Sequence, residues 1–430
     1  MASLTQKVDS TVERNLPWNF SVNLIDITFI TLAFSIISRE TITPLLISNL
    51  TDSKIAIGLV PAIYSIAYYL PQLFAANHAE RLKRKLPFVM VVGGLLERVP
   101  YLFAGLAILL FAESAPIVAL LCLYLVIGLG ALGNGVATRA WFSMIGKVLP
   151  VNRRGIFFGL SEGLGTLMGI IGAFFVGRVL DEMGYPLNFA TLFLVAAVFM
   201  GVSWIGLALN REPESPIVKE HIPFSHYFRR LPAILRDNHN FRRFLLSYSI
   251  SRLSTMGVGF FIVFGNENFE LTGADVGLLT AILIASQAAM QLLLGWLADK
   301  RGHKANLTVS GFALALAAIV ALGATDLRGL IPAFILLGVG LASDHVSRLN
   351  IILEFAVPED QPTFIGLTNT LLAPVVFLAP ILGGWLADFG YEALFMLMAG
   401  CGLAGGLLLF AWVKEPRYQP PQPISPKGKH

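Results

Sequence analysis

The chain has 430 residues, of which 55% are hydrophobic and 13% are charged, and its mean hydropathy is +0.71. Soluble proteins carry about 25% charged residues, so this composition excludes a string of water-soluble domains. The high hydropathy also excludes a disordered chain. The two cysteines, Cys122 and Cys401, both lie in apolar runs, which excludes a disulfide-built fold. The composition indicates an integral membrane protein.

The basic charge balance has an explanation in membrane topology. A net charge of +4 and an isoelectric point of about 9.0 could indicate nucleic-acid binding, but basic residues also fix the orientation of spanning helices. We therefore expect no nucleic-acid partner. Residues 1–17 are polar and have no apolar core, so they do not form a cleavable signal peptide. They are expected to be a cytoplasmic N-terminal segment.

Twelve stretches are long and apolar enough to cross a membrane, which takes about 20 residues of helix. In the first half they are 18–46, 57–76, 87–112, 116–146, 155–180 and 188–209. In the second half they are 243–266, 276–298, 305–325, 329–355, 363–387 and 392–413. The alternating pattern of a membrane β-barrel is missing from these runs.

The distribution of Lys and Arg predicts the orientation. With the N-terminus in the cytoplasm, 23 of the 31 basic residues fall in inner segments and 3 in outer ones. This bias predicts that both termini are cytoplasmic and that the protein lies in the cell membrane. The predicted domains are a bundle over 18–210, a cytoplasmic linker over 211–242, a bundle over 243–413 and a tail over 414–430.

The linker mixes apolar residues with arginines around 227–236, which predicts a short amphipathic helix on the inner membrane surface. A partner-binding role is the alternative to a plain linker.

The two halves of the chain repeat the same landmarks. Asp181 is followed by Gly184, Tyr185 and Phe189, and Asp388 is followed by Gly390, Tyr391 and Phe395. Gly58 and Gly277 also match, at an offset of 219. Such internal repeats are common in transporters. The sequence therefore predicts an all-α membrane protein with 12 transmembrane helices in two pseudo-symmetric bundles of six.

A loop motif lies between the eighth and ninth runs, where residues 295–304 read GWLADKRGHK. It resembles the loop signature of the major facilitator superfamily. The first-half segment 76–84, ANHAERLKR, is a degenerate copy with Glu80 in the place of Asp299. The resemblance covers about 18–413. It implies two six-helix bundles around a central cavity that work by alternating access.

The resemblance also implies an inner gate, at which the loop of each half meets the other half. Asp299 would face the start of the fifth span and Glu80 the start of the eleventh, because a helix N-terminus stabilises a carboxylate. Two loop glycines would permit close approach and a tight turn. Glu354 would pair with Arg301 or a nearby base. The expected gate residues are Glu80, Arg81, Arg153, Arg154, Gly295, Asp299, Arg301, Gly302 and Glu354.

Ionisable residues inside spans are costly and therefore become candidates for substrate or proton binding. They are Asp26, Arg39, Arg139, Glu162, Arg252, Asp344, His345 and Arg348. Asp344 and Arg348 share a helix face and could pair, and His345 can exchange protons near neutral pH. In the resembling family, spans one, four, seven and ten line the cavity.

Two interpretations of these charges stay open. In the functional one, the arginines of spans four, seven and ten hold a substrate or counter-charge, and Asp26 or Glu162 carries a proton. In the structural one, the charges form buried salt bridges between helices. The three ionisable groups of span ten favour function, because they exceed what one structural pair needs. Glu97 and Arg98 are expected to brace span three against a neighbour.

No motif indicates an enzyme. Phosphate-binding loops, His-rich metal motifs and catalytic constellations are missing from the sequence, so we expect no cofactor, no metal and no ATP-driven step. The sequence predicts a monomeric secondary transporter, embedded in the lipid bilayer, that moves a small organic solute with protons.

Export of an amphipathic compound is the favoured direction. Proton-driven exporters of the resembling family often carry an arginine where this chain has Tyr124, so symport and antiport both stay open. Uptake of a small organic anion and a non-transporting membrane sensor or scaffold are the alternatives.

Overall fold

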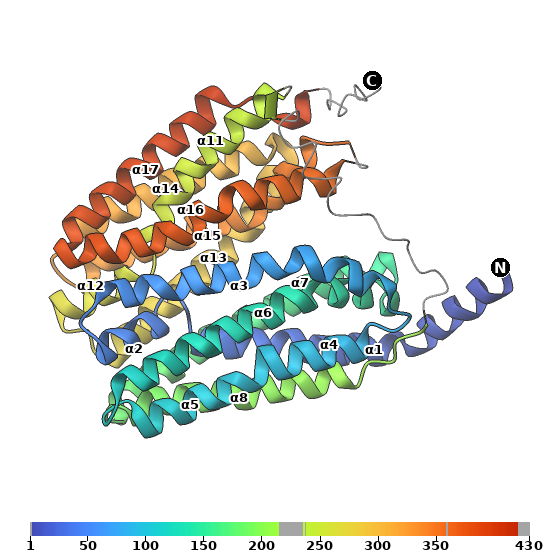
Figure 1. Ribbon diagram of the computed structural model, residues 1–430, viewed down its shortest axis with the longest axis horizontal. Helices are drawn as coiled ribbons and strands as arrows, with labels where there is room; N and C mark the ends of the chain where they lie inside the picture. The colour runs from blue at the N-terminus through green and yellow to red at the C-terminus, as the bar shows by residue number, and fades with distance from the viewer. Residues whose placement is uncertain (1, 215–234, 237, 358–359, 420–430) are drawn as a thin grey trace. The chain divides into compact units, whose positions relative to one another are not determined.

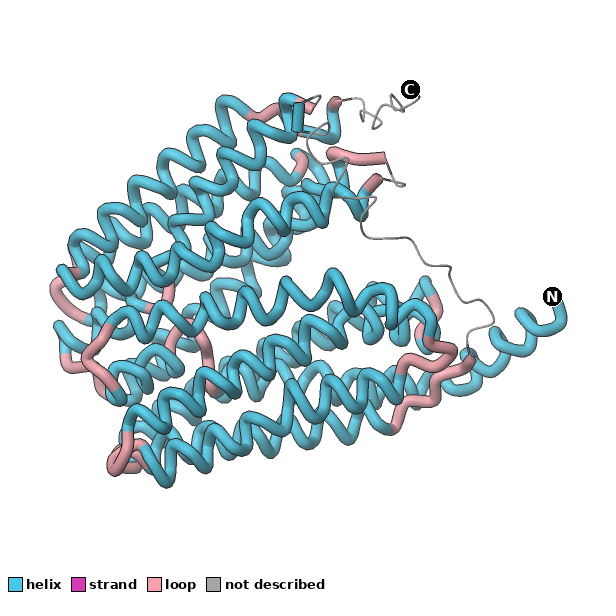
Figure 2. Tube along the Cα trace, viewed as in Figure 1, coloured by secondary structure: helices cyan, strands magenta, loops and turns pink. Residues whose placement is uncertain are grey.

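The computed structural model consists of helices joined by short loops (Figures 1 and 2). It describes residues 2–214, 235–236, 238–357 and 360–419, with side chains except at 2–11, 72–81 and 362. Within these ranges there is no β-strand. The amphipathic helix predicted around 227–236 lies almost entirely outside the described residues.

The first half contains one helix or helix run for each predicted span. Its elements are α1 (Ala2–Ile36), α2 (Ile42–Leu50), α3 (Lys54–Arg81), α4 (Leu86–Val91), the π-helix η1 (Val92–Arg98), α5 (Val99–Phe111), α6 (Pro116–Val148), α7 (Val151–Glu182) and α8 (Leu187–Ala208). The third span is the continuous run α4–η1–α5.

The second half repeats this plan. Its elements are α11 (His239–Leu253), the 3-10 helix η2 (Ser254–Gly257), α12 (Phe260–Phe269), α13 (Gly273–Arg301), α14 (His303–Leu322), α15 (Leu327–Glu354), α16 (Gln361–Phe389), α17 (Tyr391–Trp412) and the 3-10 helix η3 (Pro416–Tyr418). The seventh span is the interrupted run α11–η2–α12.

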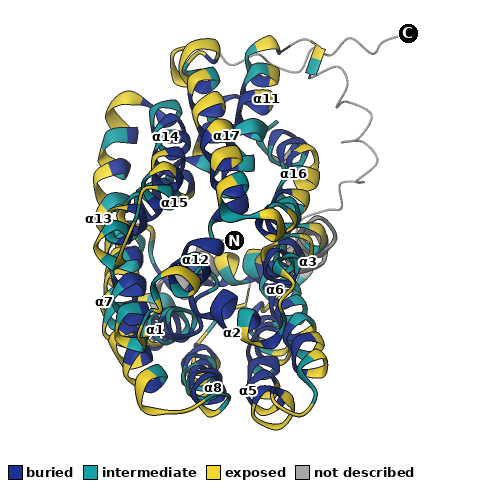
Figure 3. Ribbon diagram, turned by 90° about the vertical axis from the view of Figure 1, so that its left-hand side faces the viewer, coloured by how far each residue is buried: buried dark blue, intermediate teal, exposed yellow. Residues whose placement is uncertain are grey.

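The described residues contain 12 helical runs long and apolar enough to cross a membrane, which confirms the predicted number. Buried and exposed residues alternate along single helices, such as α17 in Figure 3. Many of the exposed side chains are large and apolar, for example Leu110, Leu292 and Phe389. In water such exposed apolar side chains would favour aggregation, whereas lipid solvates them well.

The chain forms two compact units. The first unit comprises Met1–Asp52, Ile63–His221 and Thr272–Ala281, and the second comprises Ser53–Ala62, Ile222–Leu271 and Ile282–His430. The first turns of α3 therefore pack within the second unit, and the first turns of α13 pack within the first unit.

The repeated landmarks of the sequence occupy equivalent positions. In the first unit the Asp181 carboxylate accepts hydrogen bonds from the backbone N–H groups of Gly273 and Ala274, at 2.6 and 2.8 Å. In the second unit Asp388 accepts one from the N–H of Lys54, at 3.0 Å. Each carboxylate satisfies free N–H groups at the start of a helix, where the helix dipole favours negative charge.

Gly58 and Gly277 have matching roles as well. A Cβ atom at Gly58 would lie 2.1 Å from the carbonyl oxygen of Pro380, and one at Gly277 would lie 2.6 Å from that of Ala173. Both glycines therefore allow helix backbones to touch, as small residues do in membrane bundles.

The first and last helices of each unit are joined by an asparagine. In each bundle the first span begins and the sixth span ends on the same side. We call this side the terminal end. There Asn19 donates to the backbone oxygen of Arg211 and accepts from its N–H, at 3.2 and 2.9 Å. In the second unit Asn240 makes the same two bonds to Lys414, at 2.8 and 2.9 Å.

A glutamate follows Arg211 in the first unit and Lys414 in the second. Each glutamate caps the start of the third span of its unit. Glu212 accepts hydrogen bonds from the N–H groups of Lys85 and Leu86, and from Lys147 Nζ at 2.8 Å. Glu415 accepts one from the N–H of Lys304 at 3.1 Å. The sixth span of each unit thereby fixes the start of the third.

We predict that Glu212→Gln lowers the free energy of unfolding by about 2 kcal/mol, the usual scale for hydrogen bonds to a charged group. The Glu212 side chain is 1% exposed, so water cannot replace its bonds. Thermal unfolding in detergent measures the change. The matched control is Glu214→Gln, since Glu214 and its partner Arg84 are 63% and 59% exposed and the loss should stay below about 1 kcal/mol. Equal losses in both variants would contradict the capping role.

Candidate functional site

The second unit holds a buried ion pair between its first and fourth spans. Arg252 of α11 donates from Nη1 to Asp344 Oδ2 of α15 at 2.8 Å, and Tyr248 donates from its hydroxyl to Asp344 Oδ1 at 2.5 Å. The arginine and aspartate side chains are 15% and 12% exposed. An intact ion pair this well buried adds little to the stability of the fold, but removing one partner destabilises the fold strongly because the other charge is left buried alone.

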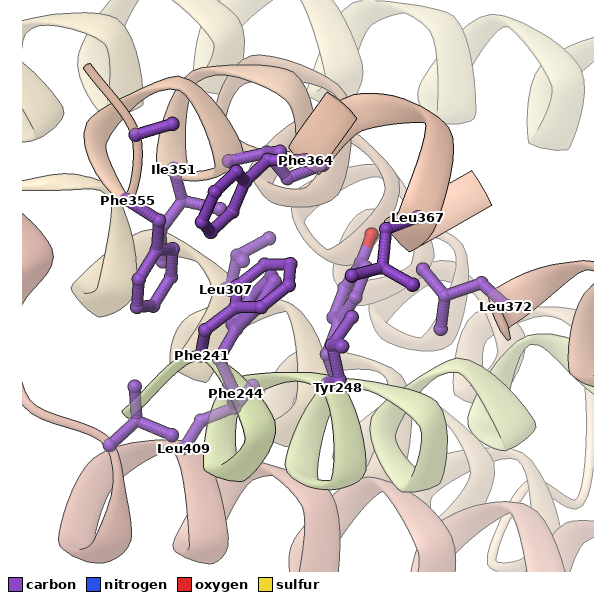
Figure 4. Packing of buried hydrophobic residues seen from close by; sticks show 14 residues of the cluster. Phe241, Phe244, Tyr248, Leu307, Ile351, Phe355, Phe364, Leu367, Leu372 and Leu409 are labelled. Carbon is purple, nitrogen blue, oxygen red and sulfur yellow. The ribbon is translucent and has the colours of Figure 1, made fainter. Parts of the chain in front are cut away.

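An apolar cluster positions Tyr248 for this contact. Figure 4 shows Tyr248 among residues of α11, α14, α15, α16 and α17, including Phe241, Phe244, Phe355 and Phe364. The ring of Tyr248 stacks on that of Phe244 with centroids 5.4 Å apart. Since the ring is almost fully buried, its hydroxyl must find a partner inside the protein, and the partner is Asp344.

The helices around this pair place further ionisable groups nearby. His345 is exposed and Arg348 is half-buried, both on α15. The sequence suggested a pair between Asp344 and Arg348, whereas the short ion pair of Asp344 is with Arg252. Regular α-helix ends one residue after Arg252, and the 3-10 turn η2 follows. Interrupted helices inside membranes are characteristic of binding sites.

The first unit holds its own buried ion pair. Arg98 donates from Nη2 to Asp26 Oδ1 at 3.0 Å, which connects the third span to α1. Ser203 of α8 donates to the same oxygen at 2.6 Å, and Trp141 of α6 donates to Asp26 Oδ2 at 3.3 Å. Four spans therefore converge on Asp26, and Arg98 has the bracing role expected of it.

A second carboxylate joins this cluster. Glu97 accepts a hydrogen bond from Arg98 Nη1 at 3.0 Å and lies 2.6 Å from the side-chain amide of Asn134 on α6. Both Glu97 and Arg98 end the π-helix η1. Such a π-helical turn within an α-helix is frequently found at functional sites.

Arg39 lies in the short break between α1 and α2. Its guanidinium lies 3.9 Å from the ring centroid of Tyr64 and 5.9 Å from that of Phe34. Among the described side chains, no carboxylate lies within ion-pair distance of it. The faces of these aromatic rings stabilise its charge.

Arg139 and Glu162 are exposed, although both lie well inside spans. Arg139 is nine residues from the end of α6, and Glu162 is eleven from the start of α7. At a rise of 1.5 Å per residue, each lies roughly 15 Å along its helix from the terminal end. Charged groups at such depth face water or other protein groups rather than lipid.

The loop between α13 and α14 has the expected tight turn. Gly302 has a φ of +86°, which favours glycine, and the Glu415 carboxylate lies directly over it. Asp299 and Arg301 are exposed. A Cβ atom at Gly295 would meet none of the described atoms within 4 Å, so within its own unit this glycine permits no close helix contact.

Of the two partners expected for Glu354, Arg301 or a nearby base, the structure shows the second. Glu354 pairs with Arg417 of η3 at 2.7 Å and not with Arg301. Arg417 also donates to the backbone oxygens of Ala298 and Asp299, at 3.0 and 2.8 Å. The chain beyond α17 folds back onto the loop, which brings a base from outside the last predicted span to Glu354.

The remaining gate residues stay predictions. Arg154 donates to the backbone oxygens of Leu149 and Gly146, and Arg153 is exposed. Glu80 and Arg81 lie outside the described side chains. Across the described part of the chain, no three His, Cys, Asp or Glu side chains gather as a metal site.

Sequence reasoning missed the capping glutamates and Arg417. A signal for them existed, because Arg211-Glu212-Pro213 after the sixth span matches Lys414-Glu415-Pro416 after the twelfth. Nothing in the sequence indicated that Tyr248, Ser203 and Trp141 contact buried aspartates.

Comparisons with known proteins agree with this architecture. The family model of the Major Facilitator Superfamily matches residues 28–265 and 244–430. An uncharacterised MFS-type transporter of Methanocaldococcus jannaschii is 22% identical over 373 residues, which cover 86% of this chain and 88% of the relative. The multidrug resistance protein MdtL of Klebsiella pneumoniae (strain 342) is 24% identical over 181 residues, 41% of this chain and 46% of that one.

Solved transporter structures share the fold. A single-residue mutant of the nucleoside transporter NupG superposes with a TM-score of 0.70 at 14% identity, covering 92% of this chain and 100% of that one. A D-xylose-proton symporter superposes with a TM-score of 0.67 at 14% identity, covering 94% and 99%. With twelve spans in two repeated bundles and a family model that matches nearly the whole chain, the protein belongs to the major facilitator superfamily.

Proposed function

We propose that the protein is a proton-coupled secondary active transporter that exports small amphipathic organic compounds across the cell membrane by alternating access. The observation that carries the proposal is the buried Arg252–Asp344 pair beside the break in the seventh span. Placing such charged groups inside a membrane costs free energy. A proton on Asp344, or an ionic ligand that competes for either partner, changes its free energy strongly.

The exposed charges of the first unit support the same function. Arg139 and Glu162 need water or a polar ligand at a depth where lipid offers neither. A transporter supplies such an environment along its solute path. The similarity to MdtL favours export of an amphipathic compound.

Uptake of a small organic anion is the second candidate. It is favoured by Arg39, whose positive charge faces aromatic rings and has no carboxylate at ion-pair distance among the described side chains. A third possibility is a membrane sensor or scaffold of the same fold that moves no solute.

We predict that an acid-inside pH gradient drives ethidium into proteoliposomes that contain the protein. Ethidium is a permanent cation, so a pH gradient alone does not trap it. An anion symporter would instead accumulate benzenesulfonate when the outside is acidic. If neither probe moves faster than in protein-free liposomes, the transport proposal fails and the sensor is favoured.

In the same assay, Asp344→Asn should slow gradient-driven ethidium uptake at least tenfold. This corresponds to an increase of about 1.4 kcal/mol in the activation free energy. The matched control is Asp326→Asn on the same helix. Asp326 caps the start of α15 through the N–H of Gly329, and asparagine caps equally well. An equal slowing in both variants would argue against a role of Asp344 in transport.

We also predict that Arg252→Met destabilises the protein by about 3 kcal/mol, because it removes the positive charge that lies 2.8 Å from the buried carboxylate of Asp344. Adding Asp344→Asn should restore more than half of the loss, since the buried charge is then gone. Thermal unfolding of the single and double variants gives the coupling energy. Arg178→Met is the control, because Arg178 is 79% exposed in its pair with Glu182. Additive losses in the double variant would contradict the buried pair.

A further inference from the structure

The two units differ at the glutamate that caps their third span. In the first unit Glu212 forms an ion pair with Lys147 near the end of α6, and the two charged atoms lie 2.8 Å apart. In the second unit the matching glutamate is Glu415, and α15 ends with Glu354. The fourth span of the first unit therefore offers the capping glutamate a cation, whereas that of the second unit offers it another carboxyl group.

The carboxyl groups of Glu354 and Glu415 lie within hydrogen-bond distance of each other. One oxygen of each group has a donor. Glu354 Oε1 accepts from Arg417 Nε and Nη2, at 2.9 and 2.7 Å. Glu415 Oε2 accepts from the backbone N–H of Lys304 at 3.1 Å.

The second oxygen of each carboxyl group is buried and has no donor. Among the described residues, nothing donates a hydrogen bond to Glu354 Oε2 or Glu415 Oε1. Two ionised carboxyl groups cannot satisfy each other, because a carboxylate only accepts. One proton shared between the groups satisfies both oxygens, since it is bonded to one and donated to the other. It also removes one of two negative charges in contact.

The nearest histidine does not replace this proton. His303 Nε2 lies 3.9 Å from Glu354 Oε1, which is too far for a hydrogen bond. Its Nδ1 lies 3.1 Å from the Ser347 hydroxyl. The imidazole therefore gives no hydrogen bond to either carboxyl group.

The nearby basic side chains of α14 and α11 face other groups. Lys304 donates from Nζ to two backbone oxygens near the end of α17, both at 3.0 Å. Arg243 of α11 lies 5.6 Å from the ring centroid of Trp412. The ionisable groups that surround the carboxyl pair from α13, α14 and η3 are Asp299, His303, Lys304, Arg417 and Tyr418.

The carboxyl pair lies where the chain after α17 folds back onto the loop between α13 and α14. The Glu415 carboxyl group lies directly over Gly302 of this loop. Loss of the shared proton would leave two negative charges in contact at a buried place, which costs free energy. Glu354 is held by the cation of Arg417, so Glu415 is the group that would move away.

We propose that Glu354 and Glu415 bind one proton between them, and that this proton holds the segment after α17 against the loop. Release transfers the proton to water, and Glu415 then withdraws from Gly302 and from the N–H of Lys304. The proposal goes beyond the transport function proposed above, because it concerns the loop of the expected inner gate and needs no solute.

Infrared spectroscopy of the purified full-length protein tests the shared proton. At weakly acidic pH the wild type should show the C=O stretching band of a buried, protonated carboxyl group. Glu354→Gln and Glu415→Gln should each remove this band, because the one carboxyl group that remains is ionised, whereas Glu212→Gln should keep it. Both variants should fold, since a glutamine amide donates and accepts as the protonated carboxyl group does. A wild type without the band, or a band that survives in either variant, would overturn the proposal.

The pH dependence of stability gives a second test. In the unfolded chain each glutamate loses its proton near about pH 4.3, whereas the folded pair keeps one proton to higher pH. The wild type should therefore lose stability as the pH rises from that value through the pH at which the pair releases its proton. Glu415→Gln has no proton to release, so it should melt at a higher temperature than the wild type at weakly alkaline pH.

The matched control for this measurement is Glu212→Gln, at the equivalent position of the first unit. It removes the partner of Lys147 and should melt below the wild type at every pH. A melting temperature of Glu415→Gln below that of the wild type at weakly alkaline pH would contradict the shared proton.

Hydrogen exchange tests whether the proton holds the segment. At weakly alkaline pH the amide of Lys304 should exchange at least tenfold faster in the wild type than in Glu415→Gln, because Glu415 has left it. At weakly acidic pH the two rates should agree within twofold. Comparing both proteins at one pH cancels the effect of pH on the exchange chemistry itself. Equal rates at weakly alkaline pH would overturn the holding role. None of these measurements uses a transported solute, so failure of the ethidium assays would refute the proposed export without touching the proton site.

Discussion

Each six-helix unit depends on one buried arginine–aspartate pair. Arg98–Asp26 joins the third span to the first, and Arg252–Asp344 joins the seventh to the tenth. Apolar side chains offer helices in lipid little specificity, because lipid solvates them as well as a neighbouring helix does. A buried charge, in contrast, is tolerated only where its partner lies. The pairs therefore fix which helices meet, and both arginines sit where regular α-helix is interrupted or ends.

The two units share their outer framework and differ in their charge clusters. In both, an asparagine joins the first and last spans, and a glutamate caps the third. In the first unit two carboxylates share Arg98, whereas in the second Asp344 lies near Arg252 and Arg348. The first cluster therefore holds two carboxyl groups for one guanidinium, while positive charge dominates the second.

The sequence predicted the fold well. Each spanning helix is indicated by the hydropathy of its own short stretch of chain, and the repeated landmarks are short local patterns. Asp181 and Asp388, matched only as landmarks, turned out to cap equivalent helices. The site was harder to predict. Asp344 forms an ion pair with Arg252, a residue 92 positions away, which no short-range pattern in the sequence indicates. Glu354 takes the second of its two expected partners, a nearby base, because the chain beyond the last span folds back and brings Arg417 to it. Glu97 was expected only to brace a helix, since no pattern indicates that Arg98 is shared with Asp26.

The central claim is the proposal that the protein exchanges protons for a small organic solute. The most direct test is the internal pH of proteoliposomes given an inward ethidium gradient, with no initial pH gradient and the membrane potential clamped. The account predicts that the interior becomes alkaline as ethidium enters, because each entering cation is exchanged for a departing proton. Ethidium entry at the same rate with an unchanged internal pH would contradict it.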